Sequence, residues 1–332
     1  MSALVGQRID RLLIQAEQQR RLVYTTDIAD ESALRKRVKT GELAIPYPGM
    51  FAREASWRKL GPGERSLRIV RTLACKHPSW VFCSYSAALV LGLSISYRLL
   101  DRIHVVAPAR SNTRSTSRIR RHRLNLDAIE VVQGVPVTNP AQTVLSCLLE
   151  APFPDGLAIA DSAARLYQLE EASLIEYVET AGRGRHGIGQ ARQTIRCVDA
   201  RAESGGESIA RAVMIEEGFQ IPELQVTLPD PCNPNRSYRG DFLWHLDSQE
   251  SRIARGLPYA ENIIGEMDGF QKYTDEDMLG GATFSQALVR ERQRESRLTA
   301  YGIPIVRFTY ADVRTPGRLA TILDAFGVPR AR

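Results

Sequence analysis

The chain has 332 residues, of which 43% are apolar and 25% are charged, a composition typical of a globular protein with two or three domains. No apolar run reaches the ~18 residues that a membrane-spanning helix needs, and the first residues lack the apolar core of a signal peptide, so a cytoplasmic protein without a membrane partner is expected. The five cysteines are scattered and form no CxxC motif, which argues against a disulfide framework or a cysteine zinc site.

Residues 1–60 predict a winged helix-turn-helix domain that binds DNA. The apolar spacing indicates a helix over residues 5–21, a short turn or helix follows at 25–30, and a basic helix is expected over 32–39. Two short strands over 43–53 would form the wing, in the order typical of this fold. The alternative is a small helical domain with an exposed basic face. The residues expected to contact DNA are Ser32, Arg35, Lys36 and Lys39.

Residues 61–150 predict a second, small α/β domain. Helices are expected over residues 65–77 and 84–93, and strands over 103–106 and 129–132. A further helix should begin at Pro140 with Asn139 as its N-cap, which is the favoured arrangement. This segment shows no recognisable catalytic constellation.

Between those two strands, residues 108–123 contain six arginines and no acidic residue. The net charge of the whole chain is only +6, so a local concentration of charge matters more than the total. Such a block attracts the DNA backbone through counterion release, although a solvated basic loop is an equally good interpretation. The block consists of Arg110, Arg114, Arg118, Arg120, Arg121 and Arg123, of which Arg114, Arg118, Arg120 and Arg121 are the candidate DNA contacts.

Residues 151–200 indicate a helical connector followed by a basic linker. The segment 182–187 matches the GxGxxG pattern of dinucleotide-binding proteins. In those proteins the pattern follows a strand, whereas here it follows a helix expected over 173–181. The pattern therefore does not predict a nucleotide site.

Residues 201–332 predict elements in the order α-β-β-β-α-β-α. The expected helices cover residues 204–217, 283–301 and 316–326, and the expected strands cover 224–228, 239–246, 262–267 and 304–310. Two of these strands carry carboxylates among apolar neighbours, Asp241 on one and Glu266 on the next. Glu207 lies in the first turns of the leading helix.

The three carboxylates predict a divalent metal site. Burying an ionised carboxylate is costly unless a cation compensates it, and two carboxylates ~4 Å apart repel by roughly 4 kcal/mol at an effective dielectric constant of about 20. Glu207, Asp241 and Glu266 together offer the oxygen ligands that Mg²⁺ or Mn²⁺ prefers, and such an ion can activate water against a phosphodiester. The basic residues nearby could bind phosphate, with an ordinary solvated helix face as the alternative for the arginines; they are Lys272, Arg290, Arg292, Arg294 and Arg297.

At these residues the chain resembles the very-short-patch-repair-like branch of the PD-(D/E)XK nuclease superfamily. The resemblance covers residues 201–330 and rests on the segments SGGESIAR, RGDFLW, GEMDGFQKY, RQRESRL and PIVRF. It implies a restriction-endonuclease-like α-β-β-β-α-β core in which Asp241, Glu266 and Glu207 bind the metal ion. Asp268 stands where the family has its lysine, and Lys272 is the nearest residue that can supply that charge.

The first 150 residues resemble the winged-helix and following domain of AbiEi-type antitoxins. This resemblance rests on the segments YTTDIADESALRKRVKTGEL, PGMF and VPVTNPAQTVLSCLL. It implies a DNA-binding protein that can have a toxin as its partner.

Two functions follow as expectations. The first is a Mg²⁺-dependent DNA endonuclease that its own winged helix directs to DNA. The second is a non-catalytic, antitoxin-like transcriptional regulator with a degenerate nuclease domain, and a nucleic-acid-binding scaffold with neither role is a third. The sequence does not indicate an oligomeric state.

Overall fold

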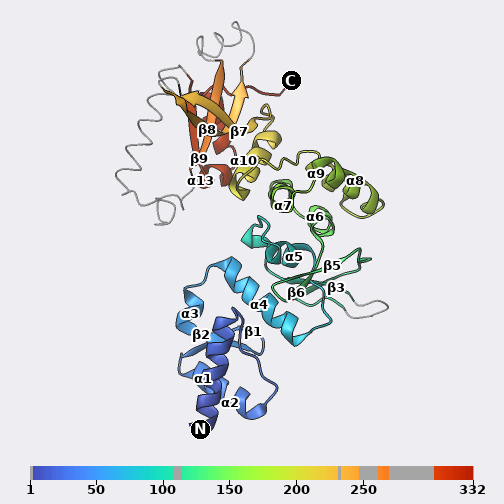
Figure 1. Cartoon of the computed structure of the whole chain (residues 1–332), viewed down its shortest axis with the longest axis vertical. Helices are drawn as coiled ribbons and strands as arrows, with labels where there is room; N and C mark the ends of the chain where they lie inside the picture. Colours follow the sequence, from blue (N-terminus) through green and yellow to red (C-terminus); the bar gives the residue numbers. More distant parts are fainter. Residues whose placement is uncertain (1–2, 108–113, 231–232, 247–260, 269–302, 332) are drawn as a thin grey trace. The chain divides into compact units, whose positions relative to one another are not determined.

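The computed structural model describes residues 3–107, 114–230, 233–246, 261–268 and 303–331 (Figure 1). The chain is mixed α/β and divides into two compact units, an N-terminal unit (Met1–Cys147) and a C-terminal unit (Leu148–Arg332). Among the described helices, none is both long enough and apolar enough to cross a membrane. The expected helix over 283–301, with its arginines, lies outside the described residues, as do Lys272 and Arg110.

The N-terminal unit contains helices and short two-stranded pairings. Its helices are α1 (Ala3–Gln18), α2 (Ile28–Lys39), α3 (Glu54–Arg58), α4 (Pro62–Lys76) and α5 (Ser84–Val90), with a 3₁₀ turn at Tyr97–Leu99, and α6 (Pro140–Leu148) begins in it. Its strands are β1 (Leu43–Tyr47), β2 (Met50–Arg53), β3 (Ile103–Val106), β4 (Ile119–His122), β5 (Ile129–Val132) and β6 (Val135–Thr138).

The first part of this unit packs α1 and α2 against the β1–β2 hairpin. Ile9 and Leu13 of α1, Leu34 of α2 and Phe51 of β2 form a shared core, each no more than 1% exposed. The basic helix begins at Ile28, four residues before the predicted start, because Asp27 caps it by accepting a hydrogen bond from the Asp30 N–H at 2.8 Å. The predicted pair of short strands is confirmed as an antiparallel hairpin.

The second part of this unit pairs β3 with β4 in parallel and β5 with β6 in an antiparallel hairpin. Strands β3 and β5 have the predicted bounds, whereas β4 lies inside the arginine block, so part of that block is a strand. The predicted cap of α6 is confirmed, since Asn139 Oδ1 accepts a hydrogen bond from the Gln142 N–H at 2.8 Å.

The C-terminal unit combines helices with one sheet of four strands. Its helices are α7 (Phe153–Leu166), α8 (Glu171–Ala181), α9 (Ile188–Ile195), α10 (Gly205–Glu216), α13 (Tyr310–Arg314) and α14 (Arg318–Ala325). Its strands are β7 (Glu223–Asp230), β8 (Asn233–His245), β9 (Asn262–Asp268) and β10 (Ile305–Thr309). The sheet order is β10-β9-β8-β7, and β10 runs parallel to β9 while the other pairs are antiparallel.

Helix α10 packs on this sheet and joins it to α7 (Figure 1). Phe242, Trp244 and Phe308 from the sheet share a core with Met214 of α10. On the other side of α10, the Arg211 guanidinium forms a buried ion pair with the Asp161 carboxylate of α7. The position of α10 is therefore fixed both by apolar packing and by a buried charge pair.

The GxGxxG segment joins α8 to α9, which confirms that it follows a helix rather than a strand. Its last glycine, Gly187, has a φ of 83°, and a Cβ atom there would lie 2.0 Å from the backbone oxygen of Leu149. This glycine is therefore required by the local packing of the chain.

Candidate functional site

The two acidic strands are neighbours, as the sequence predicts. Phe242 of β8 pairs with Gly265 of β9, which puts Asp241 and Glu266 one residue beyond that pair on adjacent strands. The Asp241 carboxylate accepts a hydrogen bond from the Met267 N–H at 2.9 Å. Glu266 is buried, with 7% of its surface exposed. The sheet thus brings two of the three predicted metal ligands together.

Glu207 is held at the start of α10 by an array of donors. Ser204, the N-cap of this helix, donates to the Glu207 carboxylate at 2.8 Å, and the Glu203 N–H donates to it at 3.0 Å. Burial raises the pKa of Glu207, and the nearby charge of Asp241 raises it further, although the hydrogen bonds oppose this shift. A hydrogen bond from Gln225 of β7 to the same carboxylate places Glu207 beside the sheet.

Gln225 of β7 belongs to this site, and the sequence did not predict it. Its neighbours Leu224 and Val226 pair with Phe242 and Gly240 of β8, so Gln225 lies opposite Asp241. The Gln225 Nε2 donates a hydrogen bond to the Glu207 carboxylate at 2.9 Å. Its Oε1 is buried and accepts no hydrogen bond in the described part of the chain. Gln225 also has a φ of 55°, which is unusual for a residue other than glycine and is a form of strain found at functional sites.

Arg307 is the second residue that the sequence analysis missed. It lies on β10 directly opposite Glu266, and its guanidinium contacts the Glu266 carboxylate at 3.0 Å. The only sequence signal is a single arginine inside an otherwise apolar strand, and its partner cannot be read from that pattern. Arg307 supplies a positive charge next to the acidic pair, where Lys272 was the expected source.

The oxygen atoms of the site suit Mg²⁺ or Mn²⁺ in kind but are not gathered for chelation. No three of Glu207, Asp241, Glu266 and Asp268 have carboxylate oxygens all within 4.8 Å of one another at their described positions. An ion bound by three of these carboxylates therefore requires at least one side chain to rotate. The unpaired Oε1 of Gln225 is a further oxygen ligand within the same array. Asp268 ends β9 and is half-buried, opposite Thr309.

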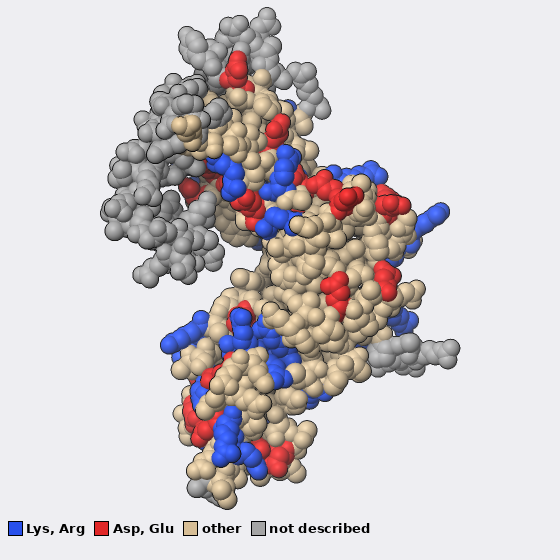
Figure 2. Space-filling model, in the orientation of Figure 1, with Lys and Arg blue, Asp and Glu red and all other residues tan. Residues whose placement is uncertain are grey.

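The predicted DNA-contact residues of α2 share its exposed surface. Ser32, Arg35, Lys36 and Lys39 are all exposed, and their spacing places them along one side of the helix. Arg35 is paired with Glu31 of the same helix at 2.7 Å, whereas the buried Ala33 and Leu34 face the core. Figure 2 shows basic patches on the visible face of the N-terminal unit.

The arginine block contacts aromatic residues of the same unit. The Arg118 guanidinium lies 5.7 Å from the ring centre of Tyr47 at the end of β1, and that of Arg121 lies 5.2 Å from the ring centre of Trp80. Arg114 and Arg118 are exposed, and Arg120 and Arg121 are half-buried on β4. Arg118 therefore lies beside the β1–β2 hairpin, and Arg121 lies beside Trp80.

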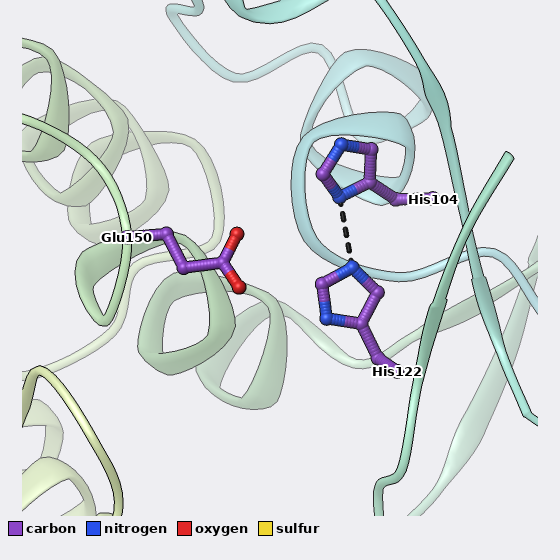
Figure 3. Close-up of side chains that lie close together, drawn as sticks. All are labelled: His104, His122 and Glu150. Carbon is purple, nitrogen blue, oxygen red and sulfur yellow. Dashed lines mark hydrogen bonds between the residues drawn. The ribbon is translucent and has the colours of Figure 1, made fainter. Parts of the chain in front are cut away.

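A histidine pair lies in the N-terminal unit, with one ring on β3 and the other at the end of β4, next to the arginine block (Figure 3). His104 Nδ1 and His122 Nε2 are 2.9 Å apart, and this hydrogen bond links β3 to β4. Burial, reinforced by the charges of His122, Arg120 and Arg102, lowers the pKa of His104 to about 3. Glu150, also labelled in Figure 3, belongs to the C-terminal unit.

Comparison with known proteins gives relatives but no assigned activity. No family model and no solved structure matches the chain significantly. The uncharacterized proteins MT2308 and Rv2248, from two strains of Mycobacterium tuberculosis, are each 30% identical to it over 241 residues. That match covers 72% of this chain and 78% of each relative.

Proposed function

The chain belongs to the same family as the Mycobacterium tuberculosis proteins MT2308 and Rv2248, and we propose that it is a DNA-binding protein that hydrolyses phosphodiester bonds with a divalent metal ion. In this proposal α1, α2 and the β1–β2 hairpin form a winged helix-turn-helix, and α10 with β7 to β10 forms a nuclease-like core. The expected location is the cytoplasm. A toxin partner is expected only if the protein is an antitoxin-like transcriptional regulator, the second candidate described below.

One observation carries the proposal: Asp241 and Glu266 lie opposite each other on adjacent strands, and Glu207 is tied to the same sheet through Gln225 of β7. Natural proteins seldom bury carboxylates side by side without a cation or a shared proton to compensate them. Arg307 compensates Glu266 at 3.0 Å, but the described residues provide no such cation for Asp241 and Glu207. The excess negative charge at Asp241 and Glu207 favours a divalent ion.

In the proposed site, Asp241 and Glu266 bind Mg²⁺ or Mn²⁺, and Glu207 and the Gln225 Oε1 complete the oxygen array. A bound ion of this kind activates water and stabilises the charge that develops on the phosphate. Arg307 pairs with Glu266 and orients it, and Asp268 and Lys272 are further candidates for contact with the scissile phosphate. Residues of α2 and the arginine block contact the DNA backbone.

The proposal is tested with supercoiled plasmid in the presence of Mg²⁺ or Mn²⁺. The protein should nick the plasmid, and Asp241→Asn should reduce nicking by more than the ~100-fold that loss of an outer-sphere partner of a metal costs. Glu207→Gln should weaken nicking too, whereas Glu216→Gln, an exposed change on the same helix, should not. Nicking that survives in Asp241→Asn would assign the activity to another site or to a contaminant.

The second candidate is a transcriptional regulator that binds DNA without cutting it. It is favoured by the Glu266–Arg307 ion pair, which already neutralises one of the three predicted ligands, and by Asp268 in the place of the motif lysine. If no divalent ion supports nicking while the protein still binds DNA, this function replaces the first. The variant Arg35→Ala/Lys36→Ala should then lose affinity for DNA and show a weaker salt dependence of binding.

A further inference from the structure

The N-terminal unit contains an open pocket that none of the functions above uses. It has a volume of about 410 Å³, within the range of about 300–1,000 Å³ typical of small-molecule sites. The end of α1, the side of α4 and the β5–β6 turn form its wall. The polar lining residues are Gln18, Gln19, Arg20, Arg21, Arg71, Cys75 and Gln133. We call this the arginine pocket.

The arginine pocket has more positive charge than the protein neutralises. Its nearest carboxylate, Glu64, is shared by Arg20 at 2.7 Å, by Arg68 at 3.0 Å and by Arg71 at 3.9 Å. Arg21 has no ion-pair partner in the described part of the chain; its contacts are the Sγ of Cys75 at 2.5 Å and the Gln19 side chain. Three guanidinium groups therefore share one carboxylate and Arg21 pairs with none in the described part of the chain, an arrangement that an anion would stabilise.

Arg71 is the deepest of these cations. Its side chain is 11% exposed, its Nη2 donates to the Gln133 Oε1 at 2.6 Å, and its Nη1 is buried without a hydrogen-bond acceptor among the described residues. Burial lowers the pKa of Arg71, and the charges of Arg20 and Arg68 lower it further against the opposing effect of Glu64. A buried donor without an acceptor is costly, so the protein itself leaves the Arg71 guanidinium incompletely paired.

Two lining residues also have strained backbones. Arg20, just after α1, and Gln133, in the β5–β6 turn, each have a φ of 50°, a region that residues other than glycine seldom occupy. Five such residues occur in the described chain, and two of them line this pocket. Strain of this kind persists only where the surrounding structure holds it in place, and it clusters at ligand-binding and active sites.

We propose that the arginine pocket binds a small phosphate-bearing molecule, such as a nucleotide, through Arg71, Arg21 and Arg20. Arginine is the side chain best matched to phosphate, because its planar guanidinium offers paired donors. A small molecule fits better than the DNA backbone, since DNA contacts projecting side chains and Arg71 lies inside the pocket. The ligand would contact the end of α1, α4 and the β5–β6 turn at the same time. It would therefore hold these three elements of the N-terminal unit more rigidly together.

Binding is measured on the full-length protein by titration calorimetry with pyrophosphate and with ATP. The Arg71→Gln variant should bind about 10-fold more weakly or worse, which is the effect of losing one charged hydrogen bond. Arg21→Gln gives a second test that leaves no carboxylate unpaired, and it should also weaken binding. Arg58→Gln, an exposed arginine on α3 outside the pocket, is the matched control and should bind as the unaltered protein does.

Cys75 provides a readout inside the pocket that does not depend on nuclease activity. It is exposed, whereas Cys83 and Cys147 are buried, so its alkylation by iodoacetamide can be followed by mass spectrometry. Pyrophosphate or ATP should slow alkylation of Cys75 in the unaltered protein and not in Arg21→Gln. Three results would overturn the proposal: no binding of either compound, equal binding by Arg21→Gln, or protection of Cys75 by a short DNA duplex alone.

Discussion

The ion pair between Asp161 and Arg211 gives the sharpest prediction about stability. The Arg211 Nη2 lies 2.8 Å and 3.0 Å from the two Asp161 oxygens, and the side chains of Arg211 and Asp161 are 4% and 0% exposed, respectively. Removing one partner of such a pair leaves a buried charge uncompensated and typically costs about 3–5 kcal/mol. Asp161→Asn is the cleanest change, because asparagine keeps an oxygen that can accept from the Asp199 N–H, which now donates to Asp161 at 2.8 Å.

The double variant Asp161→Asn/Arg211→Met separates charge from packing. It removes both charges while keeping most of the side-chain volume, so it should be more stable than Asp161→Asn alone by about 2 kcal/mol or more. Because α10 also carries Glu207, Asp161→Asn should weaken the proposed Mg²⁺ binding as well, whereas the double variant should restore part of it.

The assay is urea denaturation followed by the fluorescence of Trp244, which is 1% exposed in the core of the C-terminal unit. Trp57→Phe and Trp80→Phe remove the signals of the N-terminal unit, so that a single transition is attributed to the C-terminal unit. A loss below about 1 kcal/mol for Asp161→Asn, or a double variant as unstable as the single one, would refute the argument that this pair fixes α10.

Two further predictions concern the backbone and pH. Gly187→Ala should destabilise the C-terminal unit by roughly 3 kcal/mol or more, because it combines a left-handed φ with the clash against Leu149, whereas Gly184→Ala, at a φ of 74° with free space around it, should cost about 1–2 kcal/mol. His104 has a folded-state pKa of about 3, below its ordinary value of 6.5. Neutral His104 therefore contributes its full share of the free energy of unfolding above pH 6.5. That share falls by about 1.4 kcal/mol per pH unit as the pH drops from 6.5 toward 3. NMR should show a neutral His104 ring at pH 5, and His104→Asn should flatten the pH dependence of stability; a ring that gains its proton near pH 6 contradicts this account.

The sequence predicts best the features that depend on neighbouring residues. The bounds of β3 and β5 follow from short apolar runs, and the cap at Asn139 follows from its position before Pro140. Strand β4 was missed because its arginines hide the alternation of a strand, which becomes apparent only when it pairs with β3. Helix α13 was missed although Thr309 and Asp312 form a capping box at its start.

For the candidate site, the sequence predicts the carboxylates but not what surrounds them. Asp241 and Glu266 stand out because acidic residues are unexpected in apolar strands. Gln225 and Arg307 do not stand out, since their importance comes from partners on other strands. The φ of 55° at Gln225 has no sequence signature, because glutamine is not a residue that favours this backbone region.

The parallel pairing of β9 with β10 also sets an order of assembly. Parallel strands need a long connection, and contacts between residues distant in sequence form late in folding. Glu266 precedes Arg307 by 41 residues in the chain and is synthesised first, so β10 can pair with β9 only after those residues have been made. A nascent chain that ends before β10 therefore lacks Arg307 beside Glu266. For the proposed nuclease, the site would be complete only after β10 has been synthesised.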